Sequence, residues 1–194
     1  MAKENATDYT RDRIIKCAAE LFAESGYKGV SMREISSAAG ISKASIYYYF
    51  SSKEDLYLSL VVHDMEQLVK GLEVIASAQE EPPVLLRRFI KHYVDFSHNR
   101  GPIIKLAFRE LAGMGERLHE LLPGIVTRMQ RSLQGILIRG NLGIGQPEMA
   151  ACAIFGMAHI LTLHDKQGTT WNSSEITSFV CNLIIDRGSD SSMQ

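Results

Sequence analysis

The chain has 194 residues, of which 45% are hydrophobic and 22% are charged, and its formal net charge is −1. These values are those of an ordinary globular protein with room for one or two domains and a sizeable core. The near-zero net charge excludes a strongly basic protein, although a local basic patch is enough to bind nucleic acid. No apolar run reaches the roughly 18 residues of a membrane span, and the polar start predicts no signal peptide.

The three cysteines, Cys17, Cys152 and Cys181, are odd in number and lack a CxxC spacing. This usage is typical of free thiols in a reducing cytoplasm, where we expect the protein to reside. A redox switch built on the thiols stays open as an alternative. The six histidines show neither HxxxH nor HExxH spacing, and no GxSxG motif or phosphate-binding loop is present. We therefore expect no metal, no cofactor and no enzymatic activity.

The first predicted helix covers residues 10–25 and follows a polar tail at residues 1–8. Its apolar residues recur at i, i+4, i+7 and i+8 from Ile14, which places them on one face. Gly26 ends this helix.

Residues 31–53, SMREISSAAGISKASIYYYFSSK, predict two short helices joined by a tight turn. Ser31 and Glu34 have the spacing of a capping box at the start of the first helix. Gly40 supplies the left-handed backbone of the turn, and Ser42 can cap the second helix. This is the helix-turn-helix pattern, in which the second helix enters the major groove of DNA.

If Ile46 and Phe50 face inward, the polar residues of the second helix face outward. Residues in its first turn can reach base edges, whereas hydroxyl and ammonium groups around it can hold phosphates. The alternative is a tyrosine face that packs inside a small helical core. The predicted DNA-binding residues are Ser31, Arg33, Ser42, Lys43, Ala44, Ser45, Tyr47, Tyr48, Tyr49 and Lys53, of which Lys43, Ala44 and Ser45 face bases.

From about Thr10 to Leu60 the chain resembles the N-terminal domain of TetR/AcrR-type bacterial repressors. The matching motifs are an AxxLFxxxGYxGxS start, an IxxAAGIS turn and an IYYYFxSKExL end. The resemblance implies an all-α fold in which a long helix joins the helix-turn-helix domain to a C-terminal ligand-binding and dimerisation domain. We expect the first domain at residues 9–69, with the helix-turn-helix at about 32–51, and the second at 80–188. Ala44 stands where the family often has Gly, which implies a different local base preference.

A long helix is predicted to start at Ser51 or Ser52 and to run to about Ala78. Glu54 and Asp55 in its first turn complement the helix dipole. At 1.5 Å per residue this helix spans about 40 Å, which is too long for the small DNA-reading unit alone. We therefore expect it to continue into the C-terminal half.

Beyond the QEEPP segment the pattern is helical, and no convincing strand is predicted. Prolines are expected to open two of these helices as first-turn residues. The predicted helices cover residues 84–98, 103–111, 123–139, 147–166 and 172–188. Asn172 and Glu175 give the last of them a capping-box-like start.

The predicted helix that begins at Pro147 is apolar nearly all round. Such a helix must be buried on most sides, and a second copy of the chain is the simplest partner for a terminal helix pair. We predict a two-fold homodimer through the last two helices, as the resemblance also implies; the alternative is a core helix in a monomer. The predicted interface residues are Ile154, Met157, Ala158, Leu161, Ile176, Phe179, Val180 and Leu183.

Aromatic, methionine and histidine side chains recur along the C-terminal helices and the long helix. The resemblance implies a ligand cavity between these helices, although side chains at helical spacing more often form plain core. A ligand there should be lipophilic with a few polar anchors, and His92 is one candidate anchor. The predicted pocket residues are His63, Phe89, Tyr93, Phe96, Phe108, Met129, Phe155 and His159.

The sequence therefore predicts a homodimeric transcriptional repressor that binds a palindromic operator in double-stranded DNA. We expect a small lipophilic effector to release it through a shift between two conformations. The alternatives are a thiol-based redox-sensing regulator and a nucleoid-associated DNA-binding protein on the same fold.

Overall fold

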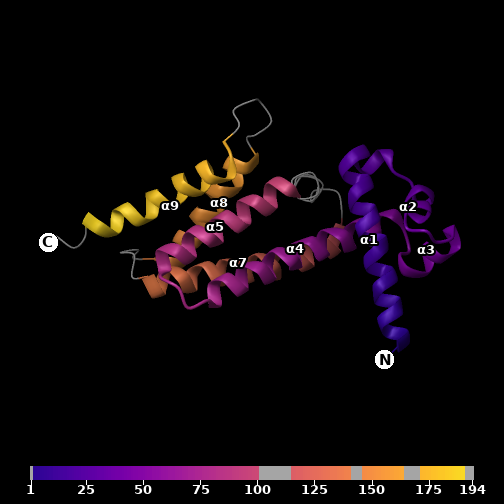
Figure 1. Ribbon diagram of the computed structural model, residues 1–194, viewed down its shortest axis with the longest axis horizontal. Coiled ribbons are helices and arrows are strands. Elements are labelled where there is room, and N and C mark those ends of the chain that lie inside the picture. The colour runs from indigo at the N-terminus through magenta and orange to yellow at the C-terminus, as the bar shows by residue number, and fades with distance from the viewer. Residues whose placement is uncertain (1, 101–114, 141–145, 164–170, 191–194) are drawn as a thin grey trace. The chain divides into compact units, whose positions relative to one another are not determined.

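The computed structural model describes residues 2–100, 115–140, 146–163 and 171–190, and every element within these ranges is an α-helix (Figure 1). The predicted all-α fold is thereby confirmed. The helices are α1 (Ala2–Gly29), α2 (Met32–Ala38), α3 (Lys43–Tyr49), α4 (Lys53–Ser77), α5 (Pro82–Asn99), α7 (Gly115–Gly140), α8 (Pro147–Leu163) and α9 (Ser173–Asp190).

The chain divides into two compact units, and the boundary between Asp64 and Met65 lies inside α4. The first unit holds α1, α2, α3 and the start of α4. The second holds the rest of α4 together with α5, α8, α9 and most of α7. One continuous helix therefore contributes residues to both units, as the long apolar pattern after Ser52 predicts.

The core of the first unit is formed by the apolar face predicted for its first helix. Ile14, Ala18 and Phe22 on α1 are buried, and so are Ile35 on α2 and Ile46 on α3. Burial of such side chains contributes roughly 1.5–3 kcal/mol each, which holds three short elements together.

The path of α1 has one predicted and one unpredicted feature. Gly26 has a positive φ of 71°, which breaks the helical path at the predicted position. The helix begins at Ala2, however, and the prediction of a polar tail over residues 1–8 is wrong. Residues 2–9 contain neither Gly nor Pro, and nothing in their sequence stops a helix from extending to this point.

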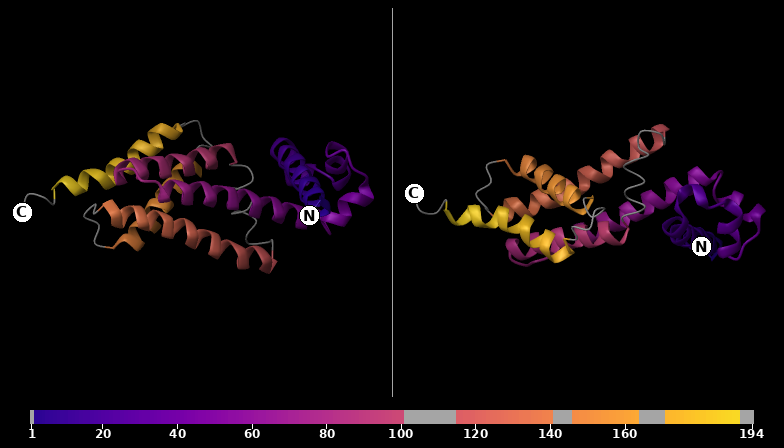
Figure 2. Two further views of the ribbon diagram at one scale, coloured as in Figure 1. Left: turned by 60° about the horizontal axis from the view of Figure 1, so that its bottom comes forward. Right: turned by 90° about the horizontal axis from the view of Figure 1, so that it is seen from above.

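The second unit is built around α5, which lies against both α8 and α9 (Figures 1 and 2). Its inner face consists of Leu85, Leu86, Phe89, Ile90 and Val94, all of which are buried. This spacing of i, i+1, i+4, i+5 and i+9 is the apolar stripe of a helix packed on one side.

A close approach between α4 and α5 depends on a glycine. A Cβ atom placed on Gly71 would lie 2.3 Å from Nε2 of His92, well inside contact distance. Gly71 therefore lets the imidazole of His92 rest directly on the backbone of α4.

The remaining helices differ from their predicted bounds only at their ends. Pro123 lies inside α7 rather than in its first turn, because α7 begins at Gly115. The preceding GERLHELL segment is rich in strong helix formers, which accounts for the earlier start. The start of α9 is as predicted: the Glu175 N–H donates to Asn172 Oδ1 at 3.0 Å, and the Asn172 N–H donates to Glu175 Oε2 at 2.7 Å. The predicted helix over residues 103–111 lies outside the described residues.

Candidate nucleic-acid interface

The N-terminus of α2 is fixed by the predicted capping box. Ser31 Oγ accepts the Glu34 N–H at 3.3 Å, and Glu34 Oε2 accepts both the N–H and the hydroxyl of Ser31 at 2.7 Å. These hydrogen bonds, aided by the charge of Lys53, hold the pKa of the Glu34 carboxyl below its usual range. Because the Ser31 hydroxyl is committed to Glu34, it would have to turn away from this carboxylate to donate to a phosphate.

The turn between α2 and α3 has the backbone that the sequence predicts. Gly40 has a φ of 62°, in the left-handed region that L side chains rarely adopt. Ser42 then caps α3, since its Oγ accepts the Ser45 N–H at 3.0 Å and lies 2.8 Å from Ser45 Oγ. The cap and the buried Ile46 fix which face of α3 is turned outward.

The outward face of α3 carries the residues predicted to contact DNA. Lys43 and Ala44 in the first turn are exposed, whereas Ser45 is half-buried. Tyr48 is 80% exposed and Tyr47 is 46% exposed. This exposure contradicts the alternative in which the tyrosine face packs inside the core.

Tyr49 and Tyr48 support each other at the end of α3. Their rings meet edge to face, with 5.2 Å between the centroids, and Tyr49 is half-buried. An edge-to-face pair stabilises one orientation of both rings. The contact thereby limits the directions in which the hydroxyl of Tyr48 can point.

Lys53 occupies a position that the sequence did not reveal. Its Nζ donates to the backbone carbonyls of Tyr27 at 2.7 Å and Val30 at 2.8 Å, and it lies 4.3 Å from the centre of the Tyr27 ring. These contacts tie the first turn of α4 to the link between α1 and α2. Lys53 was predicted to hold a phosphate, but two of its three donors serve this internal contact.

The ten predicted DNA-binding residues all lie on α2, α3 or the residues that cap them and start α4. Arg33 and Lys43 are exposed, and within the described residues neither side chain makes a hydrogen bond or ion pair. Their charges are therefore available to a polyanion. The structure thus places the predicted residues on or beside α2 and α3 and at the start of α4. Ser31, Ser42 and Lys53 also make hydrogen bonds within the fold.

The predicted ligand-pocket residues are only partly brought together. Phe155 on α8 meets Phe89 and Tyr93 on α5 edge to face, with centroid distances of 5.8 and 5.3 Å. Tyr93 Oη lies 3.1 Å from Nδ1 of His159, also on α8. We call these four residues the aromatic cluster. Met129 is buried, Phe96 and His63 are half-buried, and Phe108 lies outside the described residues.

Burial changes the acid–base properties of the aromatic cluster. It raises the pKa of Tyr93 to about 12 and lowers the pKa of His159. Both side chains are therefore neutral at physiological pH. Such a pair forms the polar end of an otherwise apolar cluster.

The predicted dimer residues divide between the inside and the outside of the protomer. Ile154, Ala158, Ile176 and Val180, which were predicted to lie in a dimer interface, are buried within a single chain. The helical pattern could not separate an inner from an outer apolar face, because α8 is apolar on both. The exposed large apolar residues of this region are Met149, Ile160, Trp171, Phe179 and Leu183.

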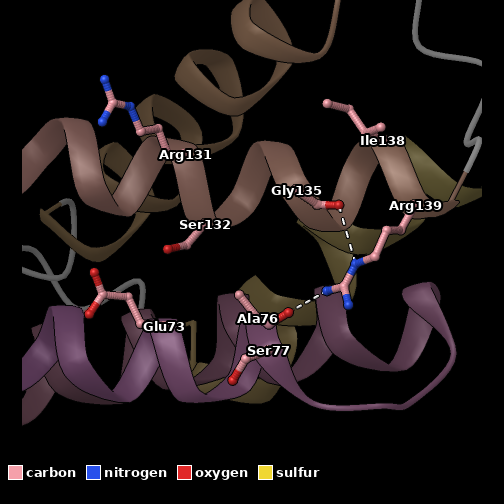
Figure 3. Close-up of a pocket in the computed structure, with 8 residues that line it drawn as sticks. All are labelled: Glu73, Ala76, Ser77, Arg131, Ser132, Gly135, Ile138 and Arg139. Atoms are coloured by element: carbon pink, nitrogen blue, oxygen red, sulfur yellow. Dashed lines mark hydrogen bonds between the residues drawn. The ribbon is translucent and has the colours of Figure 1, made fainter.

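The described residues of the second unit line at least two hollows. One, of about 510 Å³, lies between the C-terminal parts of α4 and α7 (Figure 3). Another, of about 380 Å³, lies between α8 and α9 beside Trp171 and Phe179. In the first hollow, the Arg139 guanidinium donates to the Ala76 carbonyl, which joins the ends of the two helices.

A salt-bridge cluster between α7 and α4 was missed by the sequence analysis. Nε and Nη2 of Arg128 each donate to one oxygen of Glu73 at 2.9 Å, and Nη1 donates to both oxygens of Glu66 at 2.9 Å. The hydrogen bonds from Arg128 lower the pKa of Glu73. Only the i, i+7 spacing of the two glutamates hints at this cluster, because Arg128 is distant in sequence.

Within the described ranges, no three His, Cys, Asp or Glu side chains gather into a metal-binding group. Nor does any helix there have the length and hydropathy to cross a membrane.

Comparison with known proteins points to one family. The family model for "Bacterial regulatory proteins, tetR family" matches residues 14–60. The probable HTH-type transcriptional regulator YttP of Bacillus subtilis is 29% identical over 134 residues, which cover 68% of this chain and 65% of YttP. The fatty acid metabolism regulator protein of B. subtilis is 28% identical over 167 residues, which cover 82% of this chain and 81% of that protein. The chain thus spans just under two thirds of YttP.

Solved structures share the complete fold. FadR from B. subtilis, in complex with stearoyl-CoA, has a TM-score of 0.72 and 23% identity, and the match covers 90% of this chain and 97% of FadR. AibR, in complex with isovaleryl coenzyme A and operator DNA, has a TM-score of 0.69 and 19% identity, with 91% of this chain and 98% of AibR covered. At these identities the similarity shows the fold.

The capped helix pair, with its exposed basic and tyrosine face, forms a helix-turn-helix unit within an all-helical fold. More narrowly, residues 14–60 match the TetR family of bacterial regulatory proteins, and the relatives compared above are named as regulators.

Proposed function

We propose that the protein is a homodimeric repressor that binds a palindromic operator and is released by an acyl-CoA or a related lipophilic acyl compound. The proposal that the protein binds DNA is supported chiefly by the outward face of α3. There an exposed lysine, two exposed tyrosines and a fixed N-terminal cap occur together. Two such helices, one from each protomer, would read half-sites about one DNA turn apart.

The proposed effector class is supported by the relatives and by the aromatic cluster. A relative of similar length is named as a regulator of fatty acid metabolism, and two proteins of the same fold are complexes with acyl-CoA compounds. The aromatic cluster offers apolar surface together with a neutral Tyr93–His159 hydrogen bond. Such a pair can exchange its internal hydrogen bond for one to a carbonyl group of a ligand.

The proposed dimer is supported by the surface of α8 and α9. Phe179 and Ile160 are each 55% exposed, and the apolar hollow beside Phe179 and Trp171 lies on the same two helices. An exposed aromatic residue beside a hollow is self-complementary under a two-fold axis. A second copy of the chain is therefore the partner that we propose for this surface, and its two-fold symmetry would match that of a palindromic operator.

The thiol-based alternative finds little support in the described residues. Burial raises the pKa of Cys181 to about 11, so this thiol stays protonated at neutral pH. Cys17 is half-buried and Cys152 is exposed. A nucleoid-associated role would be indicated by many genomic sites and by the lack of any effector.

The proposal is tested on a duplex that the wild-type protein selects from a random-sequence library. We expect the selected sequence to be palindromic and to bind two protomers. Stearoyl-CoA should weaken this binding, whereas free coenzyme A at the same concentration should not. A coupling free energy of about 1–3 kcal/mol would weaken binding roughly 5- to 150-fold.

Each part of the proposal can fail separately. Enrichment of no sequence would contradict operator recognition and favour the nucleoid-associated alternative. A selected palindrome whose affinity stays constant with acyl-CoA compounds of short and long chains would contradict the effector class alone. Binding that changes only with thiol oxidation would favour the redox alternative.

A further inference from the structure

The guanidinium of Arg11 on α1 lies beside the C-terminal end of α3. Its central carbon is 5.2 Å from the centroid of the Phe50 ring, and Phe50 is the residue that caps α3. Phe50 is only 1% exposed, whereas Arg11 is half-buried. Arg11 therefore covers an edge of the core and places a positive charge next to the recognition helix.

The contact with Phe50 leaves the donors of Arg11 available. A cation–π contact is not a conventional hydrogen bond, so it leaves the five N–H donors of the guanidinium available to other partners. Within the described residues, Arg11 makes no hydrogen bond or ion pair. The side chain is thus held in place without its hydrogen-bonding capacity being used.

The position of Arg11 complements that of Lys43. Lys43 is the first residue of α3, and Phe50 immediately follows its last. A helix of seven residues is about 10 Å long, which is close to the width of about 12 Å of the major groove. When such a helix lies in the groove, cations at its two ends come near the sugar–phosphate backbones that border it.

We infer that Arg11 is a further DNA-contacting residue of this protein, which binds a backbone phosphate at the C-terminal end of the recognition helix. The cation–π contact with Phe50 pre-orders the guanidinium, so that less side-chain entropy is lost on binding. The contact is independent of base sequence, since a phosphate carries no base information. This inference rests on the DNA-binding function proposed above.

The test compares Arg11→Gln with Arg11→Lys and with Arg13→Gln. Arg13 is a matched control because it is exposed, lies two residues along the same helix and has no aromatic partner among the described residues. Binding is measured across a salt series to the duplex selected by the wild-type protein and to an unrelated duplex. The unfolding temperature of each variant is measured in parallel.

Arg11→Gln should weaken binding to both duplexes by the same factor of about 10, which corresponds to one charged hydrogen bond. The slope of log affinity against log salt should fall by about 0.9 for each protomer. Arg11→Lys should retain the slope because it keeps the charge. Arg13→Gln should leave both affinity and slope unchanged.

Two results would overturn the inference. One is an Arg11→Gln variant with the wild-type salt slope, whether or not its unfolding temperature falls, because Arg11 would then act only in the fold. The other is an equal loss of slope in Arg11→Gln and Arg13→Gln, which would indicate a diffuse effect of charge. Wild-type protein that binds neither duplex would overturn the proposed function and this inference with it, and only that outcome contradicts both.

Discussion

At the scale of single residues, Lys53 shows how a side chain that was predicted to bind DNA can belong to the fold. Its ammonium lies between the carbonyls of Tyr27 and Val30 at 2.7 and 2.8 Å. Removal of the charge leaves both carbonyls without this donor. Hydrogen bonds to charged groups contribute about 1.5–3 kcal/mol.

Lys53→Met keeps the aliphatic stem and removes the donors. We expect its free energy of unfolding in urea to fall by about 3 kcal/mol, because two charge-assisted hydrogen bonds of about 1.5 kcal/mol or more each are lost. Lys43→Met is the control, since Lys43 is exposed and has no such partners, and it should leave stability nearly unchanged. Equal stability of the two variants would show that the hydrogen bonds of Lys53 do not stabilise the fold, and phosphate binding would remain as its only proposed role.

Gly71 provides a second test at this scale. Its replacement by Ala places a Cβ against the His92 ring, so Gly71→Ala should destabilise the protein by about 1–2 kcal/mol despite the better helix propensity of Ala. Gly124→Ala is the matched control, because no heavy atom lies within 4 Å of its new Cβ. This control should gain up to about 1 kcal/mol, as measured by urea unfolding.

His92→Ala, added to Gly71→Ala, should remove the clash and restore the gain expected from Ala. If Gly71→Ala alone stabilises the protein as much as Gly124→Ala does, the close approach of α4 and α5 does not constrain the fold.

At the scale of helices, the sequence predicts contacts between residues close in the chain and misses contacts between residues far apart in it. The caps at Ser31, Ser42 and Asn172 depend on residues three apart, and each is found as predicted. The contacts of Arg128 with Glu66 and Glu73 join residues 62 and 55 apart, and no sequence spacing encodes them. Likewise, the buried side of α8 depends on where α5 lies, which its apolar pattern alone cannot specify.

Arg128 joins α7 to the helix that both units share. In Arg128→Ala, the carboxylates of Glu66 and Glu73 lose their common counter-charge, so we expect a lower urea midpoint of unfolding. Arg128→Lys should recover only part of it, because an ammonium cannot form two planar forks. Arg131→Ala is the control, since Arg131 is exposed and makes no hydrogen bond within the described residues.

Salt distinguishes the ion pairs of Arg128 from packing effects. The cluster is partly exposed, so 1 M NaCl should reduce the difference between wild type and Arg128→Ala. A difference that is independent of salt would assign the effect to the lost aliphatic stem.

The histidines on α5 and α8 predict a pH dependence of stability. Burial lowers the pKa of His92 and His159 below their usual 6.5, so the folded state binds fewer protons than the unfolded state. Stability is therefore fully present above pH 6.5 and falls as the pH decreases through the folded-state values. We expect a lower free energy of unfolding at pH 5.5 than at pH 7.5.

The double variant His92→Gln/His159→Gln should show a smaller decrease between pH 7.5 and pH 5.5 than the wild type. Each protein is compared with itself at pH 7.5, where both histidines are largely neutral in the folded and unfolded states. An unchanged pH dependence in the double variant would assign the loss to other groups.

At the scale of the whole molecule, sequence and structure agree on the class of fold. Four of the eight residues that the sequence predicted for a dimer interface on α8 and α9 are buried within one chain. A helix of alternating apolar and small residues cannot show which of its sides is covered within the chain. Only the positions of the other helices separate Ile154 and Val180 from Phe179 and Leu183.

The exposed apolar surface around Phe179 is predicted to hold two protomers together. Phe179→Glu places a charge in the exposed apolar surface and leaves the buried side of α9 intact. We expect wild-type protein to sediment at about twice the chain mass of 21.6 kDa and the variant to sediment as a monomer with an unchanged helical circular dichroism spectrum. Val74→Glu on α4 is the control, because Val74 is also exposed but lies on another helix.

Loss of the dimer should weaken binding to the full palindrome but not binding to a single half-site. In a dimer, binding of one recognition helix holds the second near its half-site at a high effective concentration. Separate monomers lack this gain in affinity. The affinity of Phe179→Glu for the selected palindrome should therefore fall by at least about 100-fold, while its affinity for a single half-site should match that of the wild-type protein. A Phe179→Glu variant that stays dimeric and binds the palindrome normally would place the interface on another surface of the chain.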